Sequence, residues 1–167
     1  PLVSVIMPTY NYGRFIGEAV DSVLDQTYKN FELVIVDNYS TDETKDLVMS
    51  LKDERVKFFE FDNKGSIAAA RNFGWKKANG ELIAFLDSDD KFMSTKLEKQ
   101  VVAHTSELTL SHHDLRLFGS TRVGIAKGRN LGNRPKIEML TKGNPINTSS
   151  VMLSKKLLEM SNGFSEE

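Results

Sequence analysis

Residues 33–38 read Leu-Val-Ile-Val-Asp-Asn, so that four apolar side chains are followed directly by two polar ones. An apolar run without alternation is typical of a strand that is covered on both faces, as strands of parallel sheets are. The polar pair then marks the carboxyl end of that strand. This stretch predicts a parallel sheet with a loop that starts at Asp37 and Asn38.

The same succession of strand and helix recurs through the first 105 residues. Apolar residues at helical spacing predict helices over residues 14–26, 66–78 and 95–104, and another after residue 40. Short apolar or β-branched runs predict strands over residues 3–7, 56–61 and 82–86. Four β–α units of about 25 residues pack as a mostly parallel sheet with helices on both faces, which is a Rossmann-like α/β fold.

Three local signals predict where elements begin or end. Pro8 has no N–H to donate to a sheet, so the first strand is expected to end there. Ser40 and Glu43 have the spacing of a capping box, which predicts the start of a helix. Asn79 and Gly80 follow the third helix, where a left-handed cap is expected.

Residues beyond 105 are less regular. Residues 108–118 and 146–153 are candidate strands, and residues 155–160 are expected to form a short helix. Residues 115–137 contain six basic side chains and no acid, and form either a solvated, mobile loop or a cationic flap over a phosphate-bearing ligand. The basic residues are Arg116, Arg122, Lys127, Arg129, Arg134 and Lys136.

Composition excludes several classes of protein. A net charge of −1 gives no overall field that would attract nucleic acid. No apolar run approaches the roughly 20 residues that span a bilayer, so no transmembrane segment is expected. The absence of cysteine excludes a disulfide framework and a thiolate metal site, and fits a reducing compartment such as the cytoplasm. A chain of 167 residues fits one domain.

Ligands of open α/β sheets bind beyond the carboxyl ends of the strands. That rule selects residues 8–11, 37–40, 63–65 and 87–90, whose side chains are expected to meet at one edge of the sheet. None of these turns contains the glycine motif of a dinucleotide-binding or P-loop site, which disfavours both.

The strongest chemical signal is the acidic run at residues 87–90. Asp87, Asp89 and Asp90 repel one another, so they need a counter-charge if they are even partly desolvated. With no cysteine or histidine nearby, the natural counter-charge is Mg²⁺ or Mn²⁺, which takes oxygen ligands and shares its coordination with substrate phosphates. The alternative is an acidic turn that caps the following helix.

Other polar residues at this edge allow two interpretations each. Arg71 either reaches the ligand to pair with phosphate or lies on the exposed face of its helix. Asp37 and Asn38 either bind a base or ribose or serve turn chemistry alone. The same ambiguity applies to the loop after the first strand, although an exposed tyrosine suits stacking on a base. That loop contains Thr9, Tyr10 and Asn11.

These segments together resemble the family 2 glycosyltransferases with the GT-A fold. The resemblance covers nearly the whole chain, in the family's order and spacing. The matching stretches are residues 3–11 (VSVIMPTYN), 22–28 (SVLDQTY), 31–42, 69–72 (AARN), 80–81, 85–90 (FLDSDD), 147–151 (NTSSV) and 163–164.

The resemblance implies a role for each matched residue. Asp89, with Asp87, would coordinate Mn²⁺ or Mg²⁺ that bridges the diphosphate of the donor, and Arg71 would meet the base or diphosphate side. An acceptor hydroxyl would attack the anomeric carbon from the opposite face, with inversion. The implied nucleotide-sugar-binding residues are Pro8, Thr9, Tyr10, Asn11, Asp37, Asn38, Arg71, Asp87 and Ser88.

Two departures from the family pattern matter. The family commonly has Asp-Asp where this chain has Asp37-Asn38; an Asn carbonyl could accept a uracil N–H, but its NH₂ could serve another base. The family's general base follows the Gly163-Phe164 segment by some residues, so it is expected beyond Glu167. Residues 1–105 are then the nucleotide-binding half and residues 106–167 the start of the acceptor-binding half of one C-terminally truncated domain, inactive alone.

The sequence thus predicts a metal-dependent, inverting enzyme that transfers a sugar from a nucleotide-sugar donor to a hydroxyl of a glycan or lipid-linked acceptor, and a UDP-sugar is the expected donor. The enzyme is expected in the cytoplasm or peripherally at the inner face of the membrane. The alternative is a binding module that holds a nucleotide-sugar without turnover. A nucleotidyltransferase is disfavoured because the first loop lacks a glycine-rich, basic phosphate cradle.

Overall fold

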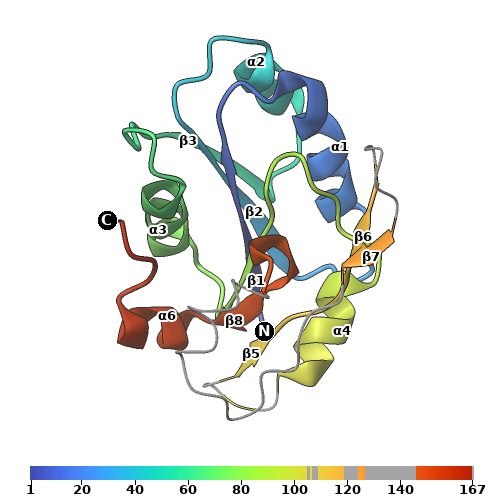
Figure 1. The fold of residues 1–167 in the computed structure, drawn as a ribbon. Coiled ribbons are helices and arrows are strands. Elements are labelled where there is room, and N and C mark those ends of the chain that lie inside the picture. Colours follow the sequence, from blue (N-terminus) through green and yellow to red (C-terminus); the bar gives the residue numbers. More distant parts are fainter. Residues whose placement is uncertain (105, 107–108, 119–123, 127–145, 167) are drawn as a thin grey trace.

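The computed structural model describes residues 1–104, 106, 109–118, 124–126 and 146–166. Within these residues the main sheet has six strands in the order β3-β2-β1-β4-β8-β5 (Figure 1). The first four strands along the chain are parallel to one another, and β8 is antiparallel to both of its neighbours. The strands are β1 (Val3–Thr9), β2 (Phe31–Asp37), β3 (Val56–Glu60), β4 (Leu82–Phe85), β5 (Leu110–Ser111) and β8 (Met152–Ser154).

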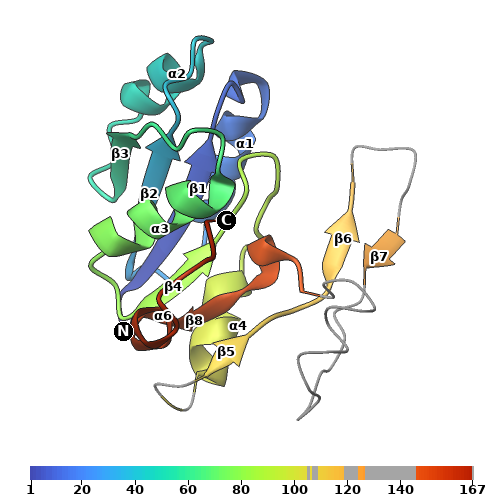
Figure 2. The ribbon, with the colours of Figure 1, turned by 60° about the vertical axis from the view of Figure 1, so that its left-hand side comes forward.

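Helices cover both faces of this sheet (Figures 1 and 2). One apolar cluster joins the sheet to α1 (Gly13–Leu24), α2 (Thr44–Ser50) and α4 (Lys96–Ala103). A second cluster, on the other face, joins it to α3 (Ile67–Lys77) and α6 (Lys155–Ser161). The predicted α/β fold with a mostly parallel, two-sided sheet is confirmed.

The central strands are buried along their whole length because both of their faces are covered. Every residue of β1 and of β2 is buried. Val5 of β1 belongs to the cluster with α1, whereas the next residue, Ile6, belongs to the cluster with α3. Because side chains alternate between the two faces along a strand, each central strand contributes to both apolar clusters.

Helix α3 lies unusually close to the sheet at Gly74. A Cβ atom on Gly74 would lie 2.5 Å from Cγ2 of Ile6, so any side chain there would push the helix outward. This close approach sets the position of the amino-terminal half of α3, which carries Arg71 toward the carboxyl ends of the strands.

The prediction that β1 ends at Pro8 is wrong by one residue, because the strand continues to Thr9. The carbonyl of Ile6 accepts from Leu86 on the β4 side, and the carbonyl of Thr9 accepts from Asn38 on the β2 side. Hydrogen-bonding sides alternate along a strand, so the nitrogen of Pro8 faces β4. Pairing of β1 with β4 has already ended at Ile6, where the two strands part, and no N–H is needed there.

The predicted capping box is also wrong. The Ser40 hydroxyl accepts from the backbone N–H of Asn11 and donates to the carboxylate of Asp37, so it is not available to a helix. Helix α2 begins at Thr44, whose N–H donates instead to Asp42 at 3.0 Å.

The left-handed cap expected after α3 is absent as well. Ala78, the residue that ends the helix, is extended, and neither Asn79 nor Gly80 has a positive φ. The backbone N–H of Asn79 donates to Glu32 at 2.6 Å, so a buried carboxylate fixes this turn.

The second half departs most from expectation. Instead of one strand over residues 108–118, β5 is followed by β6 (Leu115–Leu117), which pairs with β7 (Gly124–Ala126) in a separate hairpin (Figure 2). The strand expected at residues 146–153 is a 3₁₀ turn, η1 (Thr148–Ser150), followed by β8. The final helix is confirmed as α6.

The cationic flap cannot be placed, because most of its basic residues lie outside the described residues. Only Arg116 is described, in β6. The flap therefore stays a prediction. In the part of the chain that the structure describes, no helix combines the length and the apolar character that crossing a bilayer requires.

Candidate functional site

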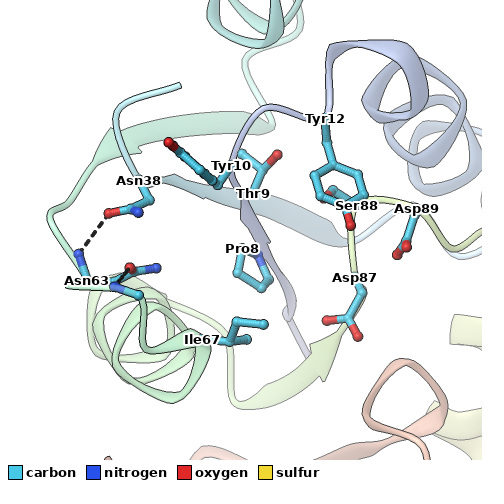
Figure 3. A pocket seen from close by; sticks show the side chains of 11 residues that line it. Pro8, Thr9, Tyr10, Tyr12, Asn38, Asn63, Ile67, Asp87, Ser88 and Asp89 are labelled. Carbon is cyan, nitrogen blue, oxygen red and sulfur yellow. Dashed lines mark hydrogen bonds between the residues drawn. The ribbon is translucent and has the colours of Figure 1, made fainter. Parts of the chain in front are cut away.

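A pocket of about 370 Å³ lies at the carboxyl ends of the parallel strands, where β1 and β4 part (Figure 3). Its volume falls in the range of small-molecule sites, roughly 300–1,000 Å³. All four strand-end loops contribute to it, as predicted. It is lined by Pro8, Thr9, Tyr10, Tyr12, Asn38, Asn63, Gly65, Ile67, Asp87, Ser88 and Asp89.

The two ends of the pocket differ chemically. Figure 3 shows the amides of Asn38 and Asn63 at one end and the carboxylates of Asp87 and Asp89 at the other, with Pro8 between them. A ligand that spans the pocket would thus present hydrogen-bonding groups at one end and negative charge, or a cation, at the other.

At the acidic end, the chain turns tightly so that three carboxylates share a small space. The N–H of Asp90 donates to the carbonyl of Asp87 at 2.9 Å, and the N–H of Asp87 donates to the Ser149 hydroxyl at 3.1 Å. Burial raises the pKa of Asp90, and the negative charges of Asp89 and Asp87 raise it further, against a hydrogen bond with Ser149 that lowers it. The cluster is therefore short of positive charge.

The positive charge that the described residues do supply comes from Arg71. Its guanidinium Nη2 lies 2.6 Å from Oδ1 of Asp87, and its side chain is 14% exposed. The interpretation of Arg71 as a surface residue is therefore wrong. Its Nε is buried and has no hydrogen-bond partner in the part of the chain that the structure describes, and its guanidinium lies 5.8 Å from the ring of Phe164. Arg71 therefore contacts Asp87 at the acidic end but is not one of the residues that line the pocket.

The acidic end fits a divalent cation only in part. Asp87 and Asp89 both line the pocket and offer the oxygen ligands that Mg²⁺ and Mn²⁺ prefer. Among the described residues, however, no group of three or more histidine, aspartate or glutamate side chains is arranged to hold a metal ion. This donor set suits a cation that takes one or two protein carboxylates and completes its coordination with phosphate oxygens and water.

Two of the predicted site residues brace the loops and do not line the pocket. Asp37 is fully buried, and both of its carboxylate oxygens accept from Ser40, one from the backbone N–H and one from the hydroxyl. Asn11, with φ 53°, accepts the N–H of Thr41 at 2.8 Å. These contacts tie the loop after β1 to the loop after β2.

The amide end is built from two linked loops. Oδ1 of Asn38 accepts the backbone N–H of Asn63 at 3.0 Å, and Oδ1 of Asn63 accepts the N–H of Gly65 at 2.8 Å. Nearby, Thr9 is buried, and its hydroxyl has no hydrogen-bond partner among the described residues. A buried hydroxyl without a partner is costly, which favours a ligand that would satisfy it.

Comparison with known proteins identifies the family. The model of the family described as glycosyl transferase family 2 matches residues 4–148. The chain belongs to glycosyl transferase family 2.

Relatives and solved structures agree with this assignment. A Haemophilus influenzae protein named as an uncharacterized glycosyltransferase is 34% identical over 167 residues, 96% of this chain and 65% of that protein. Escherichia coli WfgD, named as a UDP-Glc:alpha-D-GlcNAc-diphosphoundecaprenol beta-1,3-glucosyltransferase, is 45% identical over 100 residues, 60% of this chain and 40% of that protein. The chain thus spans about two thirds or less of these family 2 relatives.

The fold of this family 2 chain matches GT-A glycosyltransferases of known structure. S. aureus TarS in complex with UDP superposes with a TM-score of 0.78 at 26% sequence identity, over 99% of this chain and 51% of that chain. The GT-A form of the predicted α/β fold is therefore confirmed.

Sequence reasoning missed two lining residues of this pocket and assigned no role to two others. Tyr12 reaches the pocket because its N–H donates to Thr44 at 3.0 Å, a contact between distant loops that the sequence does not signal. Ile67 is the first residue of α3 and is more than half exposed. Asn63 and Gly65 lie in a strand-end segment that was selected, but nothing in the local sequence distinguished them from ordinary turn residues.

Proposed function

We propose that this chain binds the nucleotide-sugar donor of an inverting, metal-dependent glycosyltransferase. The observation that carries the proposal is the polarity of the pocket, with the carboxylates of Asp87 and Asp89 at one end and the amides of Asn38 and Asn63 at the other. A nucleoside diphosphate with a divalent cation has the matching order of groups: a base, a ribose and a charged diphosphate–cation cluster.

In this proposal, different residues of the pocket bind different parts of the nucleotide-sugar donor. Asp89, with Asp87, holds the cation at the diphosphate, while Ser88 and Thr9 lie within the same pocket as polar groups for ribose or phosphate oxygens. Mn²⁺ or Mg²⁺ bound there would offset the charge that develops on the departing nucleoside diphosphate. Tyr10, about half exposed, offers a ring on which the base can stack.

The donor is proposed to be a UDP-sugar. TarS is a structural relative that binds UDP, and a second structure of TarS, at 27% identity and a TM-score of 0.75, contains UDP-GlcNAc. The name of WfgD likewise specifies UDP-Glc. These are properties of those proteins, and they support uridine as the first nucleoside to test here.

In the proposed reaction, an acceptor hydroxyl attacks the anomeric carbon from the face opposite the diphosphate. The bond from this carbon to the diphosphate oxygen breaks as the new glycosidic bond forms, which inverts the configuration, and the hydroxyl proton passes to a general base. We assign that base to none of residues 1–167, of which 1–105 form the donor half and 106–167 begin the acceptor half.

The acceptor is proposed to be a glycan or a lipid-linked sugar. The printed name of WfgD specifies a diphosphoundecaprenol-linked acceptor, which supports the lipid-linked choice. An enzyme with such an acceptor would act in the cytoplasm, at the inner face of the membrane.

A thermal-shift measurement with UDP and Mn²⁺ tests the donor proposal. A ligand that binds the folded state raises its melting temperature, by about 5–10 °C at a ligand concentration of about 100 Kd for a domain of this size. The shift is expected with UDP and Mn²⁺ together, and to be much smaller with UDP alone, Mn²⁺ alone or uridine with Mn²⁺. Equal shifts with and without Mn²⁺ would exclude the cation, and no shift with any nucleoside diphosphate would exclude the donor site.

A further inference from the structure

The segment that follows α6 is docked on α3 by one amide side chain. The chain leaves α6 and runs back beside α3, where residues 163–166 lie against Asn72 (Figures 1 and 2). Oδ1 of Asn72 accepts the backbone N–H of Phe164 at 2.9 Å, and its Nδ2 donates to the carbonyl of the same residue at 2.9 Å. One side chain thus pairs with both backbone groups of Phe164, which fixes the position and the orientation of that residue.

Two further hydrogen bonds hold the Asn72 amide in this orientation. Its Oδ1 also accepts the indole N–H of Trp75 at 3.0 Å, and its Nδ2 also donates to the carboxylate of Glu166 at 2.7 Å. The side chain is buried, so these hydrogen bonds are costly to lose. Turning the amide over would place donor against donor and acceptor against acceptor at all of these contacts.

A glycine is required where this segment meets the amide. Gly163 has φ 73°, and a Cβ atom there would lie 2.4 Å from Oδ1 of Asn72. Asn162 before it has φ 60°, so two successive residues with positive φ turn the chain out of α6. The turn brings the backbone of Phe164 within reach of the amide, and it therefore also determines where the ring of Phe164 lies.

The ring of Phe164 contacts both supports of the acidic end of the pocket. It packs edge-on against Phe85, the last residue of β4, with the ring centroids 5.1 Å apart. It also lies 5.8 Å from the guanidinium of Arg71, a distance at which a cation is attracted to an aromatic ring. Strand β4 leads directly into Asp87, and Arg71 forms the ion pair with its carboxylate. The place of Asp87 thus depends on two groups that Phe164 touches.

The ion pair leaves one oxygen of Asp87 for a ligand. Arg71 contacts Oδ1, and within the described residues Oδ2 takes part in no hydrogen bond. Asp87 lines the pocket, whereas Arg71 does not. A guanidinium that moved into the pocket would compete with a cation for the same carboxylates, because both carry positive charge. Holding Arg71 outside the pocket therefore favours cation binding.

We infer that Asn72 is a positioning residue for the cation at the acidic end. It holds the backbone of Phe164, the ring of Phe164 holds Arg71 in place, and Arg71 contacts Asp87 through one oxygen only. This role rests on the proposed function. It adds to that function a buried side chain that is not among the residues that line the pocket.

Calorimetric titration of UDP with and without Mn²⁺ tests this role. The measured quantity is the cation gain, defined as the Kd of UDP without Mn²⁺ divided by the Kd with Mn²⁺. The variant Asn72→Asp keeps an oxygen for Trp75 but replaces the NH₂ by an acceptor that faces the carbonyl of Phe164 and the carboxylate of Glu166. The cation gain should fall at least about tenfold, as metal affinity does when a partner that orients a metal ligand is lost. The Kd without Mn²⁺ should change much less.

Glu166→Gln on the Asn72→Asp background separates this role from a general loss of structure. The glutamine NH₂ can donate to the new carboxylate, so the contact between positions 72 and 166 returns with donor and acceptor exchanged. The cation gain should recover by about threefold or more. Glu166→Gln alone should leave the gain as in the wild type, because a glutamine oxygen still accepts from Nδ2 of Asn72.

Phe164→Leu tests the next contact while leaving the Asn72 hydrogen bonds in place, because these go to the backbone of Phe164. Loss of the ring beside Arg71 should lower the cation gain by about three- to tenfold. Phe73→Leu is the matched control, since Phe73 follows Asn72 on α3 and its ring stacks on Phe61 with the centroids 4.3 Å apart. It should lower the melting temperature and leave the cation gain unchanged.

Two kinds of result would overturn the role of Asn72 while the donor site stands. One is a cation gain that stays at the wild-type value in Phe164→Leu and in folded Asn72→Asp. The other is a gain that falls as far in Phe73→Leu as in Phe164→Leu, which would assign the loss to the packing of α3 in general. If Asn72→Asp does not fold, Phe164→Leu and its control decide alone. A wild-type chain whose UDP affinity does not depend on Mn²⁺ would instead remove the proposed cation and this role together.

Discussion

Carboxylates lie at both ends of the parallel strands, which are called here the amino-terminal edge and the carboxyl-terminal edge of the sheet. Only at the amino-terminal edge do hydrogen bonds and a lysine fully compensate the negative charge. At the amino-terminal edge, Glu32 is buried and accepts from the Ser4 hydroxyl at 2.6 Å, from Lys57 at 2.5 Å and from the backbone and side chain of Asn79 at 2.6 and 3.1 Å. At the carboxyl-terminal edge, Asp87, Asp89 and Asp90 lie close together, and within the described part of the chain the ion pair of Arg71 with Asp87 is the one that these three aspartates form.

Opposite pKa shifts follow from this difference. Burial alone would raise the pKa of Glu32, but hydrogen bonds from Lys57, Ser4 and Asn79 outweigh it and lower the pKa to about 2. Burial raises the pKa of Asp90, and neighbouring carboxylates add to the rise. A buried carboxylate that accepts several hydrogen bonds from the protein stabilises the fold. A cluster of carboxylates with too little positive charge around it lowers the stability of the fold and favours binding of a cation.

Glu32→Gln should have the largest effect on stability. The free energy of unfolding at pH 7 should fall by about 3 kcal/mol, since hydrogen bonds lower the pKa of this buried carboxyl from 4.5 to about 2. Urea unfolding measures the change, and UDP affinity should not move. A loss below about 0.5 kcal/mol would contradict the assignment of Glu32 as a structural charge.

The same shift sets the acid sensitivity of the fold. Because the folded-state pKa of Glu32 is below its ordinary value of 4.5, its contribution is complete above that pH and is lost as the pH falls toward about 2. The wild-type protein should therefore lose stability over this window more steeply than Glu32→Gln does. Parallel curves for the two proteins would contradict this account.

A pair of glycine substitutions sharpens the comparison between the edges. At the amino-terminal edge, a Cβ on Gly80 would lie 2.5 Å from the Ser4 hydroxyl and 2.7 Å from its backbone N, so Gly80→Ala should cost about 2–3 kcal/mol. At the carboxyl-terminal edge, Gly65 has φ 80° but open space around it, so Gly65→Ala should cost only the backbone strain, about 1 kcal/mol. Equal losses in urea unfolding would contradict the tighter packing of the first edge.

Asp90→Asn should have the smallest effect on stability, with the opposite sign to Glu32→Gln. Its folded-state pKa is raised, so the ionised form is the one that costs stability at neutral pH, and this cost is relieved as the pH falls. Removing the charge should leave the free energy of unfolding unchanged or raise it by up to about 1 kcal/mol. A clear loss of stability would place Asp90 among the structural carboxylates.

Much of this arrangement could be predicted from the sequence, because the carboxyl ends of parallel strands meet at one edge whatever the loops contain. The apolar run that ends at Asp37 and the acidic run after β4 located two sides of the pocket in this way. The sequence could not show that Ser40 occupies both oxygens of Asp37, nor that Asn63 occupies the oxygen of Asn38. Ser40 lies only three residues after Asp37, but its hydroxyl was interpreted as a helix cap. The partner of Asn38 comes from another loop, and local spacing does not record such a contact.

The second half was predicted less well for a different reason. The strands β5, β6 and β8 have only two or three residues each, too few for a period to be read. The position of β8 follows from pairing with β4 and β5, and that of β6 from pairing with β7, rather than from their own residues.

Calorimetric titration of UDP in the presence of Mn²⁺ into the wild-type chain and into Asp89→Ala tests the central claim most directly. The claim predicts that Asp89→Ala abolishes the Mn²⁺-dependent part of UDP binding while the melting temperature of the unliganded protein stays the same. The exposed Asp21 of α1 provides the control, Asp21→Ala, which should bind as the wild type does. Unchanged affinity in Asp89→Ala would contradict the assignment of the acidic edge to a cation and its diphosphate.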